Sequence, residues 1–102
     1  MVNKDNRILT AVGPDKVGLV EKISEFIVQH RCNIEDSKMA VFCGEFALIV
    51  LISGEGKDLR EISDQYQQLA DQTGLNISVK TPAGRRTAEA SLPYRLTASL
   101  MD

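Results

Sequence analysis

Six segments with different hydrophobic periods follow one another along the chain. Four short segments are strand-like, at 7–12, 33–42, 46–53 and 76–80, and the second of them is polar at first and then apolar. Between them, apolar residues recur at spacings of three and four, which is typical of helices with one buried face. The first helix, 16–30, places Leu19, Val20, Ile23, Phe26, Ile27 and His30 on that face, and the second places Leu59, Ile62, Tyr66, Leu69 and Ala70 there. The predicted order is therefore β-α-β-β-α-β.

Polar residues and glycines predict where these elements begin and end. Asp15 is expected to cap the first helix, and Asp58 the second, with Glu61 completing a capping box. Gly74 is expected to end the second helix. A tight hairpin turn is predicted at Cys43 and Gly44, between two strand-like runs.

This order predicts an α+β protein with a ferredoxin-like βαββαβ sandwich, in which two helices cover one face of a four-stranded antiparallel sheet. The strand 46–53 is apolar on both of its sides. The face without helices therefore carries either Phe46, Leu48, Val50 and Ile52 or Ala47, Ile49 and Leu51. We expect such a row to form an interface with another subunit or domain.

Charge and cysteine content limit the range of functions. The chain has 102 residues, a length that corresponds to one domain. Its 12 basic residues are scattered along the sequence, so direct nucleic-acid binding is not expected. No apolar run is long enough to cross a membrane, and the N-terminus does not resemble a signal peptide. Cys32 and Cys43 lie at opposite ends of one predicted strand, more than about 30 Å apart, so they cannot bridge. Free thiols favour the cytoplasm.

The residue combinations and spacings that are typical of catalytic sites are missing. The single histidine, His30, lies on the apolar face of a helix and lacks a nucleophile motif. One histidine and two distant cysteines do not make a metal site. Glu35 and Asp36 are neighbours on a strand and should point to opposite faces. We therefore expect neither an enzyme nor a bound cofactor or metal.

The stretch from Val12 to Val20 is the strongest candidate for a site. It reads as a strand that turns through Gly-Pro-Asp into a helix. Gly13 permits a tight turn or a close approach to a ligand. The free N–H groups at a helix start can bind a carboxylate. Ordinary strand-to-helix turns that bind nothing share this pattern.

Residues 9–20 (Leu-Thr-Ala-Val-Gly-Pro-Asp-Lys-Val-Gly-Leu-Val), the pair Asn33-Ile34 and the run 46–52 resemble the ACT domain family over residues 6–80. The resemblance implies a ferredoxin-like module that senses amino acids and other small metabolites. It also implies a homodimer, with each ligand held between two subunits. The implied ligand-binding residues are Gly13, Pro14, Asp15, Lys16, Val17 and Gly18 of one subunit and Asn33 and Ile34 of its partner.

A closer resemblance concerns residues 32–37, Cys-Asn-Ile-Glu-Asp-Ser. They look like the tandem-ACT regulators of the glycine cleavage system, transcriptional repressors that lack a DNA-binding domain and contact a transcriptional activator. This implies a non-enzymatic regulator with an amino-acid ligand, glycine being one candidate. Two alternatives stay open. One is the regulatory ACT domain of an amino-acid or one-carbon enzyme, such as a formyltetrahydrofolate deformylase. The other is a dimerisation module without a ligand.

The C-terminal part has a different composition. We expect the ACT domain at 1–80, a linker at 81–91 and a tail at 92–102. In the tail, residues 96–98 repeat the Leu-Thr-Ala of residues 9–11. The tail is therefore a candidate first strand of a truncated second ACT domain.

Overall fold

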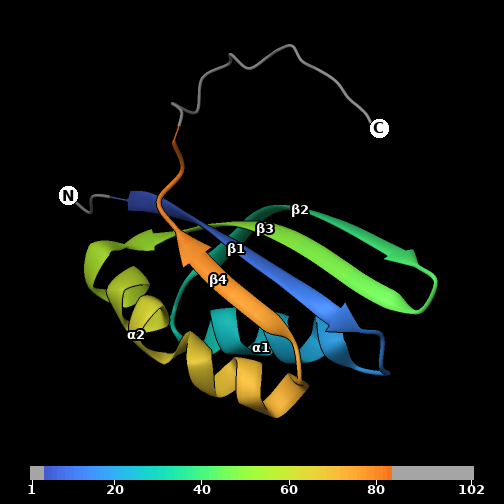
Figure 1. The fold of residues 1–102 in the computed structure, drawn as a ribbon. Coiled ribbons are helices and arrows are strands. Elements are labelled where there is room, and N and C mark those ends of the chain that lie inside the picture. Colours follow the sequence, from blue (N-terminus) through green and yellow to red (C-terminus); the bar gives the residue numbers. More distant parts are fainter. Residues whose placement is uncertain (1–3, 84–102) are drawn as a thin grey trace, which may run out of the picture.

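Four antiparallel strands form one sheet in the order β2-β3-β1-β4, and two helices cover one of its faces (Figure 1). The computed structural model describes residues 4–83. The elements are β1 (Lys4–Pro14), α1 (Leu19–Gln29), β2 (Asn33–Phe42), β3 (Glu45–Glu55), α2 (Gly56–Thr73) and β4 (Asn76–Lys80). The predicted ferredoxin-like βαββαβ order is confirmed.

The two central strands pair along their whole length. β1 and β3 run antiparallel from Lys4 opposite Glu55 to Pro14 opposite Glu45. β4 pairs with the other side of β1, and β2 pairs with β3. β2 and β4 are therefore the edges of the sheet, and each leaves one row of backbone groups without a neighbouring strand in the described chain.

The helices decide which side of β3 is buried. Phe46, Leu48, Val50 and Ile52 face the helices and are buried. Ala47, Ile49 and Leu51 alternate with them and lie on the bare face, where Ile49 is 43% exposed. The core between sheet and helices is completed by Leu9, Ala11, Leu19, Ile23, Ile27, Cys32, Leu59, Ile62, Leu69, Ala70, Leu75 and Ile77. Each large aliphatic side chain buried in this way contributes about 1.5–3 kcal/mol.

The start of the first helix was predicted wrongly. α1 begins at Leu19 instead of residue 16, and its N-cap is Gly18, which has a φ of 85°. A positive φ is accessible to glycine at little cost, so the chain enters the helix there. Asp15 lies three residues earlier and does not cap α1, which has no side-chain cap. Val20 is also outside the buried stripe, because it is 43% exposed.

The second helix begins earlier than expected. α2 starts at Gly56 after Glu55, without a side-chain cap, so the predicted capping box of Asp58 and Glu61 is not formed. Asp58 instead lies in the first turn and is buried. The predicted end is confirmed, since Gly74 has a φ of 74° and its N–H donates to Ala70 O at 2.9 Å.

The hairpin turn and the cysteine prediction are confirmed. Cys43 and Gly44 have φ values of 49° and 78° and join β2 to β3 as a two-residue turn. Cys32 is buried and Cys43 is exposed, and both are free. Among residues 4–83, no helix is long and apolar enough to span a membrane. The predicted tail at 92–102 and most of the predicted linker lie outside the described residues.

Candidate functional site

The chain changes direction between β1 and α1 in the loop 15–18. Gly13 and Pro14 belong to β1 and do not form the predicted turn. A Cβ built on Gly13 would lie 2.9 Å from Leu75 Cδ2, so glycine is needed there for packing against the turn before β4. The loop is also tied to the hairpin, because Asp15 N–H donates to Gly44 O at 2.9 Å.

A hollow of about 430 Å³ opens beside this loop. It is lined by residues 15–21 together with Met39, Val41 and Phe46. Four of the predicted site residues line it, namely Asp15, Lys16, Val17 and Gly18. Gly13 and Pro14 do not, and neither do Asn33 and Ile34.

Sequence reasoning missed the wall of this hollow that β2 provides. Met39 and Val41 pair with Leu48 and Phe46, so they lie on the helix-facing side of the sheet. Both remain exposed, as do Val17 and Val20 across the hollow. The alternation of apolar residues near the end of β2 was the available signal. It could not show that α1 stops short of covering them.

The polar groups around the hollow suit a small zwitterion. The N–H groups of the first turn of α1 have no intrahelical acceptors, because the first helical bond runs from Lys22 N–H to Gly18 O, at 3.1 Å. Together with the helix dipole, these groups favour a carboxylate. Asp15 and Glu21 on the same rim favour an ammonium group. Lys16 Nζ instead lies against Gly74, at the C-terminal end of α2.

Asn33 and Ile34 lie at the other end of β2. Asn33 pairs with Ser53, whereas Val41, at the hollow, pairs with Phe46. Eight residues of strand separate Asn33 from Val41, which corresponds to about 26 Å. Both Asn33 and Ile34 are exposed. A single chain therefore does not bring the two parts of the predicted site together.

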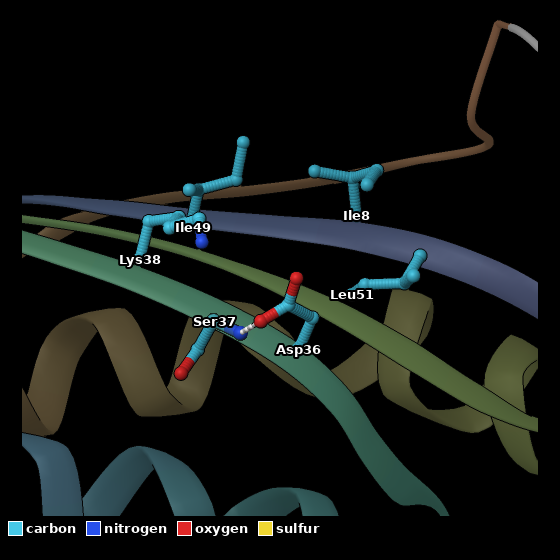
Figure 2. Close-up of a pocket in the computed structure, with 6 residues that line it drawn as sticks. All are labelled: Ile8, Asp36, Ser37, Lys38, Ile49 and Leu51. Carbon is cyan, nitrogen blue, oxygen red and sulfur yellow. Dashed lines mark hydrogen bonds between the residues drawn. The ribbon is translucent and has the colours of Figure 1, made fainter. Parts of the chain in front are cut away.

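The bare face of the sheet carries a second, smaller hollow of about 170 Å³ (Figure 2). It is lined by Ile8, Asp36, Ser37, Lys38, Ile49 and Leu51. In Figure 2 the Asp36 carboxylate stands on the side away from the helices, and Ser37 points toward the helices. A bulge between Ile34 and Asp36 interrupts the regular pairing of β2. Glu35 at this bulge accepts a hydrogen bond from Ser53 Oγ.

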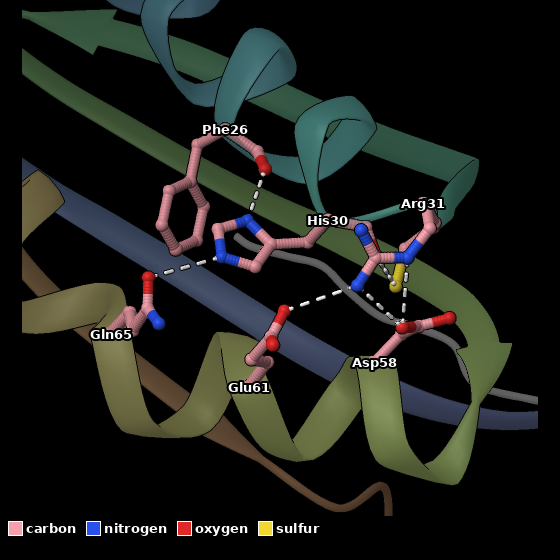
Figure 3. Close-up of polar contacts among 7 residues, drawn as sticks. Phe26, His30, Arg31, Asp58, Glu61 and Gln65 are labelled. Carbon is pink, nitrogen blue, oxygen red and sulfur yellow. Dashed lines mark hydrogen bonds and ion pairs between the residues drawn. The ribbon is translucent and has the colours of Figure 1, made fainter.

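A polar cluster joins α1 to α2 on the helical side (Figure 3). His30 Nδ1 lies 2.8 Å from Phe26 O, and its Nε2 lies 3.3 Å from Gln65 Oε1. Both ring nitrogens thus have partners, and the ring packs on Phe26 with centroids 4.5 Å apart. His30 is therefore a packing residue in this geometry. Nearby, Arg31 pairs with Asp58 and Glu61.

Cys32 lies beneath this cluster and is 4% exposed. Its thiol donates to His30 O at 3.4 Å. Burial raises the pKa of the Cys32 thiol, and the negative charge of Asp58 adds to this effect. Such a thiol is a poor nucleophile, because the reactive form is the thiolate. In the described part of the chain, no three His, Cys, Asp or Glu side chains gather into a possible metal site.

Known proteins resemble this chain over the same region. The family model described as ACT domain matches residues 7–80. A UPF0237 protein of Clostridium perfringens is 30% identical over 77 residues, which cover 74% of this chain and 86% of that protein. The glycine cleavage system transcriptional repressor of Escherichia coli is 32% identical over 78 residues, covering 76% of this chain and 41% of the repressor.

The fold agrees with a solved structure. The crystal structure of a putative glycine cleavage system transcriptional repressor superposes with a TM-score of 0.76 and 29% sequence identity. The superposition covers 83% of this chain and 50% of the chain in that crystal structure. The chain thus spans about half the length of the repressors and most of the length of the UPF0237 protein. The matched model, the identities and the βαββαβ sheet together show that this chain belongs to the ACT domain family.

Proposed function

We propose that this chain is a non-enzymatic regulatory domain that binds an amino acid in the hollow between the loop 15–18 and β2. The observation that carries the proposal is the hollow itself, which combines uncapped N–H groups of α1 with two acidic side chains. An amino acid presents a carboxylate and an ammonium group a few ångströms apart, so it matches both kinds of group. The exposed Val17, Val20, Met39 and Val41 favour a small apolar or glycine-like remainder.

The domain acts as a homodimer in this proposal. Met39 and Val41 of β2 line the hollow, and the β2 edge beside them has no neighbouring strand in the described chain. A second copy that pairs its own β2 there closes the hollow and adds Asn33 and Ile34 to it. Pairing also covers an edge that would otherwise promote aggregation.

In this proposal, the domain passes information on amino-acid binding to another protein through direct protein–protein contacts. One relative is a transcriptional repressor of the glycine cleavage system by name, and we extend this role to the present chain, with glycine as one ligand and a transcriptional activator as one partner. Free thiols at Cys32 and Cys43 fit a cytoplasmic protein.

Thermal unfolding against the twenty amino acids at millimolar concentration tests the proposal. We expect glycine or a few related amino acids to raise the Tm, because a ligand that binds only the folded state stabilises it. Val20→Glu should abolish this rise, since Val20 lines the hollow. Val28→Glu is the matched control, because Val28 is also an exposed valine on α1 but does not line the hollow. Unchanged Tm values with all twenty would contradict amino-acid binding.

A second candidate function is a dimerisation module without a ligand. The bare sheet face favours it, since Val12 and Ile49 are exposed there among other apolar residues. In that case the chain would associate, but no amino acid would change its Tm.

A further inference from the structure

The hairpin geometry determines which backbone groups of β2 face the free edge. A two-residue turn closes with a hydrogen-bonded pair, here Phe42 and Glu45, and hydrogen-bonded pairs then alternate with non-hydrogen-bonded pairs along the strands. The residues of β2 that bond to β3 are therefore Phe42, Ala40, Lys38 and Asp36. The N–H and C=O groups of the intervening residues, Val41, Met39 and Ser37, point to the edge.

Two opposite charges flank Ser37 on one face of this edge. Asp36 and Lys38 both lie on the bare face of the sheet, and Ser37 between them lies on the helical side (Figure 2). Within residues 4–83, neither charged group forms an ion pair. The order negative, neutral, positive is self-complementary when the strand meets an antiparallel copy of itself.

We propose that β2 pairs with β2 of a second copy in a single register, with the two-fold axis at Ser37. Asp36 of each copy then lies opposite Lys38 of the other, as a directly cross-strand pair in which opposite charges attract. An axis at Asp36 or at Lys38 would instead place like charges opposite each other. An axis at Met39 would leave both charges opposite uncharged residues.

The same register completes the site. This register places Asn33 and Ile34 of the second copy opposite Val41 and Ala40, at the end of β2 that borders the hollow. The bulge at Glu35 changes the pairing locally between Ile34 and Asp36. With the axis at Met39, Asn33 would lie opposite Glu45, past the hairpin turn. The charge pattern and the site thus select the same axis. This inference rests on the homodimer of the proposed function.

Cysteine cross-linking tests the axis. In a Cys43→Ser background of the full chain, Ser37→Cys should form a disulfide-linked dimer under mild oxidation, because the two Cα atoms lie about 5.5 Å apart across the axis. Met39→Cys is the matched control on the same side of the same edge. Its two Cα atoms would be about 13 Å apart, too far for a disulfide. Cross-linking of Met39→Cys but not Ser37→Cys would overturn the register.

Charge reversal provides the second measurement. By sedimentation equilibrium, Asp36→Lys and Lys38→Asp alone should each weaken the dimer roughly tenfold, since each puts two like-charged pairs across the interface. The double variant should restore the wild-type dissociation constant. If the double variant is as weak as the single ones, the register is wrong although the dimer stands. A chain that stays monomeric at high micromolar concentration would overturn both the register and the proposed homodimer, whereas amino-acid binding is decided separately by the Tm.

Discussion

Arg31 donates two hydrogen bonds to the same oxygen of Asp58, from Nε at 3.1 Å and from Nη2 at 3.0 Å to Oδ1. Asp58 is 5% exposed, and this pair ties the turn after α1 to the first turn of α2 (Figure 3). Hydrogen bonding to Asp58 and its negative charge raise the pKa of Arg31, which therefore stays charged. Arg31 holds this position at a φ of 63°, which is unusual for a residue other than glycine.

Arg31→Ala should lower the Tm by several degrees. The substitution leaves the buried Asp58 carboxylate without its donors, and an unpaired buried charge is costly. Arg60→Ala is the control, because Arg60 is exposed on α2 and forms no ion pair with residues 4–83. Arg31→Gly should be less destabilising than Arg31→Ala, since glycine adopts a positive φ at little cost. Equal Tm values for Arg31→Ala and Arg60→Ala would show that the pair contributes nothing.

Gly54→Ala should lower the free energy of unfolding by about 1–3 kcal/mol, the usual cost of overpacking. A Cβ at this position would lie 2.7 Å from Cys32 Sγ. Gly56→Ala is the matched control, because its nearest neighbour, Asp5 Oδ2, would be 3.7 Å away. Urea unfolding measures both. In a Cys32→Ala background, which removes the sulfur, the cost of Gly54→Ala should shrink; an unchanged cost would contradict a clash at Sγ.

The two thiols should differ in reactivity and in their effect on stability. Cys43 is exposed and should react quickly with iodoacetamide, while the buried Cys32 should react slowly because its pKa is raised. A raised pKa means that the folded state favours the protonated thiol. The stability that Cys32 contributes through this preference is complete below the thiol pKa of the unfolded chain, about 8.5. It is lost as the pH rises through the thiol pKa of the folded protein. Cys32→Ala should remove this alkaline loss in urea unfolding. Equal labelling rates, followed by mass spectrometry, would contradict the burial of Cys32.

Asn33→Ala should weaken amino-acid binding at least tenfold while changing the free energy of unfolding by less than about 0.5 kcal/mol. Asn33 is exposed, and its side chain makes no hydrogen bond within residues 4–83. Calorimetric titration and urea unfolding measure the two effects. A loss of several kcal/mol of stability with unchanged affinity would make Asn33 a structural residue.

The hydrophobic pattern was sufficient to predict the fold. Its spacing distinguishes helices from strands, and the apolar residues at that spacing are the ones that form the core. Ile23, Ile27, Leu59 and Ile62 are buried as their spacing predicts. Helix starts were less predictable. A polar residue near a helix start suggests a cap, but Asp58 has a stronger partner in Arg31, 27 residues away. Such long-range pairs leave no local signal.

The candidate site was only partly predictable for the same reason. The loop residues Asp15 to Gly18 are contiguous, so a motif could indicate them. Met39 and Val41 reach the hollow through strand pairing with Leu48 and Phe46, which no local pattern encodes. The exposure of Val20 depends on how far α1 extends under β2, which is also a property of the packed structure.

Backbone amide chemical shifts test the central claim most directly, namely that an amino acid binds at the loop with help from a second copy. The full chain, labelled with ¹⁵N, would be titrated with glycine and then with the other amino acids at millimolar concentration. We expect a binding amino acid to shift the amides of residues 15–21 together with those of Asn33 and Ile34, which lie at the opposite end of β2 from the hollow within one chain. A dimer in which no amino acid shifts either group, or in which only distant amides respond, would contradict the account.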